Sequence, residues 1–232
     1  MTEYIHGTAA SEQERLSTLN QLMNHGSLRE ARINPGERIV DFGSGLGQLS
    51  LAMARAAGAK LVGIERSAEQ LEKSVRHELL DLRQGSAEEP PLRSEEWGSF
   101  DVAHARFILE DDDHDILRLY PPVPGLAELW AAYMRTYDRI GCDPYVGRRL
   151  PSLLHEAGAR PVRSTFIFFG ACHGEPQFAA LVENLAGVLE SARGTIPDPP
   201  DFDGTLARLR AWSKGPEASI GYAIFWAEGV RQ

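Results

Sequence analysis

In the first half of the chain, continuous apolar runs alternate with stretches that have the composition of helices. Continuous apolar or β-prone runs at 38–42, 61–64, 79–84 and 100–109 predict buried strands. Between them, an alanine-rich stretch at 46–57 that ends at Gly58, and a stretch from Ser67 to about Leu80, predict helices. Strands that alternate with helices are typical of a parallel sheet with right-handed crossovers, so the pattern predicts an α/β fold.

Beyond residue 115 the chain has a different character. Helical spacing of apolar residues predicts helices at 126–137, 149–157, 176–191 and 206–212, and β-prone runs predict strands at 162–169 and 220–227. We interpret the aromatic stripe of the first of these helices as core packing. A further helix is expected near the N-terminus, at 11–23.

Length and charge narrow the classes of function. The 232 residues suffice for one α/β domain, which we expect to span 1–232. The formal net charge of -9 would repel phosphate backbones on average, so we expect no nucleic-acid partner. Since the chain has neither a signal-peptide pattern nor an apolar run that could span a bilayer, we expect a cytoplasmic protein with no membrane partner. The two cysteines match no metal motif.

The junction between the first strand and the following helix is rich in glycine. Gly43, Gly45 and Gly47 have a G-x-G-x-G spacing, and Gln48 stands where a dinucleotide-binding loop has its third glycine. Glycines let the main chain approach a ligand closely, and a helix N-terminus adds unpaired N–H groups. Asp41 lies beside this loop. Its carboxylate would repel a pyrophosphate, but it suits a ligand that carries an ammonium group.

A second acidic residue, Glu65, ends the strand that starts at Leu61. It follows Asp41 by 24 residues, close to the spacing at which an acidic side chain accepts both hydroxyls of a ribose. The two carboxylates therefore indicate a ligand with a ribose and an ammonium group.

The sequence D-x-G-x-G-x-G followed by an acidic strand end resembles the class I S-adenosylmethionine-dependent methyltransferases of the bacterial small-molecule subgroup. The run from Gln84 to Glu88 resembles the family's adenine loop, usually G-D-A-E, with Ser86 in place of Asp. Phe100 to Phe107 resembles its fourth strand, whose end near Arg106 passes close to the methionine part of the cofactor. The N-terminal segment, with Tyr4 to Gly7 and Glu12 to Leu16, resembles its lid helix.

This resemblance implies a Rossmann-like three-layer sandwich whose mostly parallel sheet has an antiparallel last strand. It divides the single domain into a lid helix at 1–30, a cofactor-binding half at 36–110 and a C-terminal half at 111–232 with a helical cap at about 171–216. It implies S-adenosyl-L-methionine as cofactor. The contacts that it implies come from Tyr4, Arg15, Asp41, Gly43, Ser44, Gly45, Gly47, Gln48, Glu65, Arg66, Gln70, Gly85, Ser86, Ala87 and Arg106.

The sequence departs from the family after Glu110. In the family, the fourth strand leads into a helix, an L-x-P-G-G turn and a fifth strand, whereas here Glu110 is followed at once by Asp111–Asp115. We interpret this as a deletion of about 25 to 30 residues, the usual length of a crossover unit. The sheet would then be one strand and one helix short, and acceptor binding and catalysis would be affected most.

Methyl transfer needs a general base only if the nucleophile is protonated. The candidate bases are His6, His114 and His173, although a surface or core position is the simpler interpretation of each. The acidic run at 111–115 lacks the spacing of an EF-hand. We interpret this run as a solvated or helix-capping turn and expect no metal site.

Three functions stay open at this point. The first is an active methyltransferase with a small-molecule acceptor, which the apolar face of the cap would help to bind through Phe178, Leu181, Leu185 and Leu189. The second is a protein that binds the cofactor without turnover because of the deletion. The third is a nicotinamide-dependent oxidoreductase, which the glycine spacing and Asp41 disfavour. A homodimer is compatible with each of them.

Overall fold

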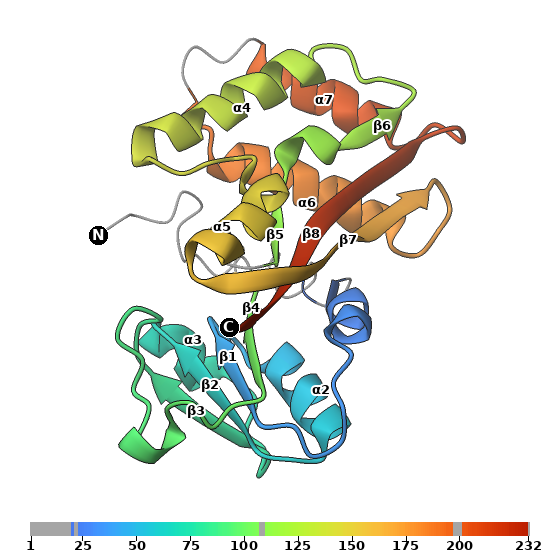
Figure 1. The fold of residues 1–232 in the computed structure, drawn as a ribbon. Coiled ribbons are helices and arrows are strands. Elements are labelled where there is room, and N and C mark those ends of the chain that lie inside the picture. The colour runs from blue at the N-terminus through green and yellow to red at the C-terminus, as the bar shows by residue number, and fades with distance from the viewer. Residues whose placement is uncertain (1–19, 21–22, 107–109, 197–200, 232) are drawn as a thin grey trace. The chain divides into compact units, whose positions relative to one another are not determined.

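The computed structural model describes residues 20, 23–106, 110–196 and 201–231 (Figure 1). The chain forms two compact units, one of residues 24–111 and one that, among the described residues, contains 20, 23 and those from 112 onward. We call residues 24–111 the parallel unit and the residues from 112 onward the antiparallel unit, after the sheets that they contain. No helix in these described ranges is long and apolar enough to cross a membrane.

The parallel unit contains a four-stranded parallel sheet in the order β3-β2-β1-β4. The strands and helices that the sequence predicts here are present, and a helix at 23–31 precedes them. In chain order the elements are β1 (Ile39–Phe42), α2 (Gln48–Ala57), β2 (Leu61–Glu65), α3 (Ala68–Lys73), β3 (Leu80–Gln84), the short 3-10 helix η1 (Ser94–Glu96) and β4 (Val102–Ala105).

Continuous apolar sequence explains the central strands. Every residue of β2 is buried, as are Ile39 and Val40 of β1, because strands in a parallel sheet are covered on both faces. Helix α2 buries one face, which includes Leu49 and Met53, against this sheet. It ends at Gly58, whose left-handed backbone directs its N–H back to the carbonyls of the last turn.

Helix α3 is shorter than predicted, since it ends at Lys73 and not near Leu80. Ser74 is extended, and its hydroxyl donates to the Leu71 carbonyl at 2.6 Å, which satisfies a group left over at the helix end. The amide of Val75 then donates to the carbonyl of Leu46 in the glycine loop at 3.0 Å. Helix α3 therefore ends early, and Val75 forms a hydrogen bond with the glycine loop instead of continuing the helix.

The antiparallel unit contains a sheet in which the long strand β8 pairs with β7 along one edge and with β6 along the other. The short strand β5 (Glu110–Asp112) lies where the two units divide. The remaining elements are η2 (His114–Ile116), β6 (Arg118–Tyr120), α4 (Leu126–Ile140), η3 (Val146–Arg149), α5 (Leu150–Glu156), β7 (Ala159–Cys172), α6 (Phe178–Ser191), α7 (Phe202–Trp212) and β8 (Ser219–Arg231).

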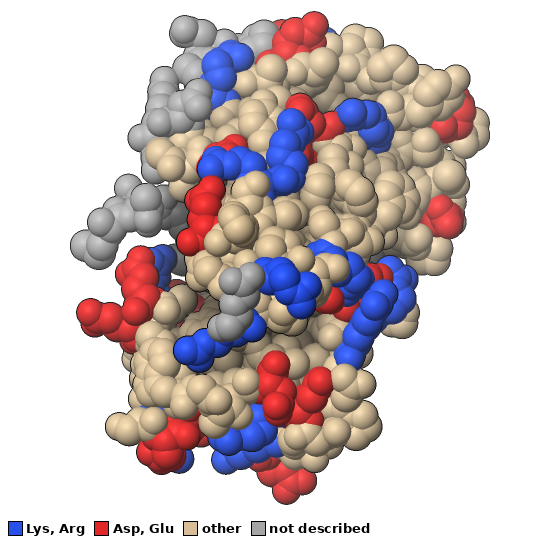
Figure 2. All heavy atoms as spheres, viewed as in Figure 1, with Lys and Arg blue, Asp and Glu red and all other residues tan. Residues whose placement is uncertain are grey.

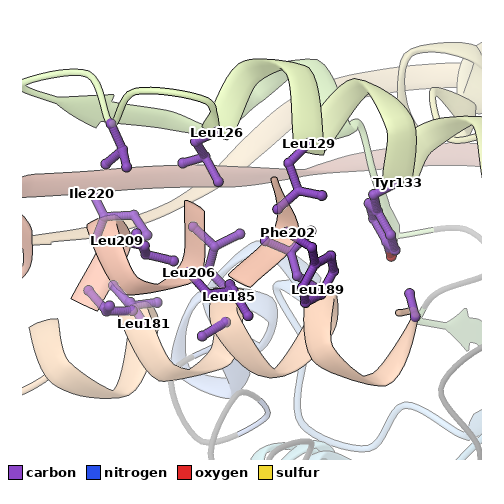
Figure 3. Close-up of a cluster of buried hydrophobic side chains, with 14 of the residues drawn as sticks. Leu126, Leu129, Tyr133, Leu181, Leu185, Leu189, Phe202, Leu206, Leu209 and Ile220 are labelled. Carbon is purple, nitrogen blue, oxygen red and sulfur yellow. The ribbon is translucent and has the colours of Figure 1, made fainter. Parts of the chain in front are cut away.

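Helices α4, α6 and α7 pack together over one hydrophobic core of the antiparallel unit (Figure 3). Leu129 and Tyr133 of the predicted aromatic stripe are buried in this core, so its interpretation as core packing is confirmed. The apolar face predicted for the cap is buried in the same core. Its members are Phe178, Leu181, Leu185 and Leu189.

The predicted fold class is confirmed as a Rossmann-like mixed α/β fold with a parallel sheet and an antiparallel last strand. The structure adds that the antiparallel strands form a sheet of their own. Among the described residues, no α-helix separates β4 from β6, as the shortened sequence requires. The deletion itself stays a prediction.

Candidate functional site

The loop between β1 and α2 has a left-handed backbone at every second position. Gly43, Gly45 and Gly47 have φ angles of 74°, 54° and 74°, which residues with a side chain adopt only under strain. The amides of Gly43 and Ser44 donate to the carbonyl of Ile64 at the end of β2, at 2.8 and 3.1 Å. No described side chain caps the N-terminus of α2, so its first amides remain available to an acceptor.

Close packing beneath the loop also requires glycine. A Cβ atom on Gly47 would lie 3.2 Å from side-chain atoms of Leu82 and Val75. A Cβ on Gly63 of β2 would lie 2.5 Å from Leu82 and 3.0 Å from Ser44, which is closer than van der Waals contact allows. Gly63 therefore lets the loop approach the sheet, a role that the sequence analysis did not assign to it.

Asp41 lies under the loop, and only 3% of its surface is exposed. One carboxylate oxygen accepts from the Ser50 hydroxyl, and the other accepts from Nδ1 of His104 at 2.8 Å. His104, on β4, is also buried, and it is the direct neighbour of Asp41 in the parallel register of β1 and β4. Nothing in the sequence indicates His104, because only the pairing of β1 and β4 brings it to Asp41.

Glu65 joins three parts of the site. Its carboxylate accepts from the Gly45 amide at 2.9 Å and from the Ser67 amide at 2.7 Å. Its own carbonyl accepts from the Gly85 amide at 3.0 Å. Glu65 thereby brings the glycine loop, the start of α3 and the segment after β3 together, and the side chain is itself largely buried.

The segment after β3 turns sharply at Gly85, where a Cβ would lie 2.4 Å from Pro91. The Ser86 hydroxyl accepts from the amide of Glu89 at 3.1 Å and so stabilises the turn, while Ala87 is exposed. Because that bond uses the Ser86 oxygen as an acceptor, the hydroxyl hydrogen remains to donate to a ligand.

An ionic cluster holds this segment against β3. The Arg83 guanidinium donates to both carboxylate oxygens of Glu96 at 2.7 Å, and to Asp81 at 2.7 Å. These hydrogen bonds lower the pKa of Glu96 to about 2 and lower the pKa of Asp81 below its usual value. The cluster fixes the chain from Gly85 to Glu96 and so stabilises the position of the predicted adenine loop.

The other residues for which the resemblance implies cofactor contacts lie in different surroundings. Gln70 lies beside the loop, since its Oε1 would be 3.1 Å from a Cβ on Gly45. Gln48 is the first residue of α2, and Arg66 is exposed after β2. The Arg106 guanidinium donates to Asn24 at 2.8 Å and so contacts the helix at 23–31. Tyr4, His6 and Arg15 lie outside the described residues.

His114 lies within a group of aromatic residues in the antiparallel unit. Its Nδ1 and Nε2 are each 2.8 Å from a tyrosine hydroxyl, that of Tyr222 and that of Tyr137 respectively. The indole N–H of Trp130 donates to its carbonyl at 2.9 Å. This buried histidine therefore takes part in a polar network inside the unit.

His173 is exposed at the end of β7, and its Nδ1 is 3.0 Å from the carbonyl of Ser213. The structure thus places the two described histidine candidates in separate networks.

The acidic run at 111–115 forms ion pairs with Arg148. Asp113 is buried and forms an ion pair with Arg148, which also contacts Asp115 at 2.9 Å. The Asp113 carboxylate accepts from the Asp115 amide and so caps η2, in line with the interpretation of the run as a capping turn. Within the described part of the chain, no group of three or more His, Cys, Asp or Glu side chains is placed to hold a metal ion.

A hollow of about 330 Å³ opens on the antiparallel unit. It is lined by Phe168, Phe169, Gly170, Gln177 and Leu181, which come from β7 and the start of α6. Ligand pockets for small molecules start at about this volume, and they are mostly apolar with a few polar groups.

The parallel unit brings hydrogen-bond acceptors and donors together at one end of its sheet. A carboxylate has about four lone-pair positions, and the described contacts of Asp41 and of Glu65 each use two of them. Both residues therefore keep acceptor capacity. The amides at the start of α2 and the turn at Gly85 lie, like Glu65, at the carboxyl ends of the strands. Parallel sheets bind ligands at this end.

Comparison with known proteins finds a family model that matches part of the chain. The family described as "Methyltransferase domain" matches residues 39–120. No curated protein matches the sequence significantly. Solved structures that are similar include the cyclase SpnF (17% identity, 91% of this chain and 83% of that chain, TM-score 0.47). They also include the YcgJ protein from Bacillus subtilis (13%, 90% and 98%, TM-score 0.44) and a geranyl diphosphate methyltransferase in complex with SAM (14%, 94% and 91%, TM-score 0.43).

Proposed function

We propose that the protein transfers the methyl group of S-adenosylmethionine to a small-molecule acceptor, and we start from the match of residues 39–120 to the family described as "Methyltransferase domain". The observation that carries the proposal is the set of hydrogen bonds around Glu65. They join the glycine loop at Gly45, the start of α3 at Ser67 and the turn at Gly85 along one edge, which would bind the ligand.

Each part of this edge has a role in holding the cofactor. Glu65 would accept the ribose hydroxyls, and Ser86 and the backbone near Gly85 would bind the adenine. The loop amides and the N-terminus of α2 would face the methionyl carboxylate, and Asp41 would offer negative charge to the ammonium. The bound cofactor supplies an electrophilic methyl group. The protein then orients the partners and excludes water.

A small acceptor is favoured by the charge and by the surface. The net charge is -9, and on the face drawn in Figure 2 Lys and Arg side chains alternate with Asp and Glu without forming a broad basic area. Nucleic-acid binding needs such an area.

Calorimetric titration with S-adenosylhomocysteine and with NAD tests the proposal. We expect the wild type to bind S-adenosylhomocysteine and not NAD. The change Glu65→Gln replaces an acceptor by an amide that meets the Gly45 or Ser67 N–H with its own donor, so the affinity should fall by about tenfold or more. Glu72→Gln, at an exposed position of α3, is the matched control and should bind as the wild type does. Preferential binding of NAD would overturn the assignment.

Turnover is measured separately from binding. Incubation with S-adenosylmethionine and a mixture of small metabolites should release S-adenosylhomocysteine if the chain is active. The deletion predicted after Glu110 is the reason to test the alternative of a binding protein without turnover. Tight binding of the cofactor without product, across a broad set of acceptors, would support that alternative.

A further inference from the structure

The contact between Asp41 and His104 adds a titratable group to the site. We propose that His104 is a positioning residue for cofactor binding, which sets through its protonation state how much negative charge Asp41 presents to the ammonium group of the ligand. This inference rests on the proposed function, because it takes the ligand to be an adenosyl amino acid.

The geometry makes the two side chains one unit. Asp41 and His104 are direct neighbours across β1 and β4, and Nδ1 is 2.8 Å from the carboxylate. With 3% and 6% of their surfaces exposed, they interact through protein more than through water. An ionised carboxylate can only accept, so Nδ1 carries the proton of this bond and orients the imidazole.

The charge of the pair depends on the second ring nitrogen. With a neutral imidazole, the pair carries the full negative charge of Asp41, which attracts an ammonium group placed at the glycine loop. With a protonated imidazole, the charge of the pair is zero, and the imidazolium itself repels a cation. Affinity for a ligand with an ammonium group should therefore rise as the pH rises through the titration of the histidine.

The polar groups described beside this pair do not produce the same effect. Arg106, just after β4, donates to Asn24 and Ser27, and arginine stays charged at every accessible pH. Glu65 accepts two backbone amides at the end of β2. Ser50, on α2, has no charge. Of these side-chain types, only histidine ordinarily changes its charge between pH 5 and 8.

Two ligands separate this effect from general binding. S-adenosylhomocysteine carries the ammonium group, whereas 5′-methylthioadenosine keeps the nucleoside and lacks the amino acid. Titration calorimetry from pH 5.5 to 8 should show about a fivefold or larger gain in affinity for S-adenosylhomocysteine and none for 5′-methylthioadenosine. By linkage, binding of S-adenosylhomocysteine near neutral pH should release protons, measured in buffers of different ionisation enthalpy.

The matched variants are His104→Asn and Ser50→Ala. Asparagine keeps a neutral donor toward Asp41 and does not titrate, so the pH dependence and the proton release should disappear. Ser50→Ala removes the other hydrogen bond of Asp41, and the pH dependence should remain. Circular dichroism melts establish that both variants are folded. If His104→Asn fails to fold, the comparison of the two ligands in the wild type still decides.

The two hypotheses fail in different ways. If neither ligand binds the wild type at any pH, the proposed function is wrong. If both bind and the pH profiles coincide, or if His104→Asn retains the proton release, the role of His104 is wrong and the proposed function stands.

Discussion

Two glycines at opposite ends of α2 have similar backbones and different surroundings. Gly47 and Gly58 have φ angles of 74° and 62°, but only Gly47 is crowded, by Leu82 and Val75. We expect Gly58→Ala to cost about 1–2 kcal/mol in the free energy of unfolding, from backbone strain alone, and to leave ligand affinity unchanged. Gly47→Ala should cost more, because a Cβ at 3.2 Å also displaces its neighbours, and should weaken S-adenosylhomocysteine binding by about tenfold.

Urea unfolding and calorimetric titration of the two variants measure these quantities. Equal losses of affinity in both variants would show that the loop has no special role. At this same scale, sequence spacing singled out Asp41, Glu65 and the loop glycines as candidates, and their part in ligand binding stays a prediction. Spacing did not indicate His104 or Gly63, because their contacts depend on which strands lie side by side.

The segment between β3 and β4 is held by one ion cluster more than by regular structure, since η1 is its only helical element in the described chain. We expect Glu96→Gln to cost about 2–3 kcal/mol at pH 7, because it leaves Arg83 with an incomplete set of partners in a mostly buried position. Glu69→Gln is the control. Its pair with Lys73 is half exposed, so the cost should be below about 0.5 kcal/mol.

The effect of pH on this variant follows from the lowered pKa of Glu96. Arg83 holds that pKa at about 2, below the usual value of 4.5 that applies in the unfolded chain. The carboxylate therefore contributes its full stability above about pH 5, and loses it as the pH falls toward 2. The difference in unfolding free energy between wild type and Glu96→Gln should be constant from pH 8 to about 5.5 and shrink below about 4.5. A difference that stays constant through pH 4 would contradict the assigned cause.

The spacing of apolar residues also predicted most helices and strands, and the errors in their bounds have identifiable causes. Apolar runs and glycine stops gave β1, α2 and β2 within two residues of their observed bounds. The helix after Ser67 was predicted too long because Val75 bonds to Leu46, a contact that helical propensity does not contain. Helices α6 and α7 were predicted within four residues of their observed bounds. The apolar face of α6 packs in one core with α4 and α7, and spacing alone does not distinguish such a face from a ligand-binding one.

At the scale of the whole molecule, each unit buries its own hydrophobic core. The residues proposed to hold the cofactor, from Asp41 to Ala87, lie in the parallel unit alone. A ligand stabilises the state that binds it, by about 2.7 kcal/mol at a concentration 100 times its Kd. If the parallel unit contains the main contacts, that stabilisation should appear as slower amide exchange there.

Hydrogen exchange with and without saturating S-adenosylhomocysteine measures this distribution. We expect increased protection at 43–51, 65–71 and 85–89, where loop and helix amides meet the ligand or the carboxylate of Glu65. The core helices α6 and α7 should exchange at the same rate in both samples, since their protection comes from packing inside the antiparallel unit. Protection confined to α6 and α7 would place the ligand in the other unit and would contradict the site built on Glu65.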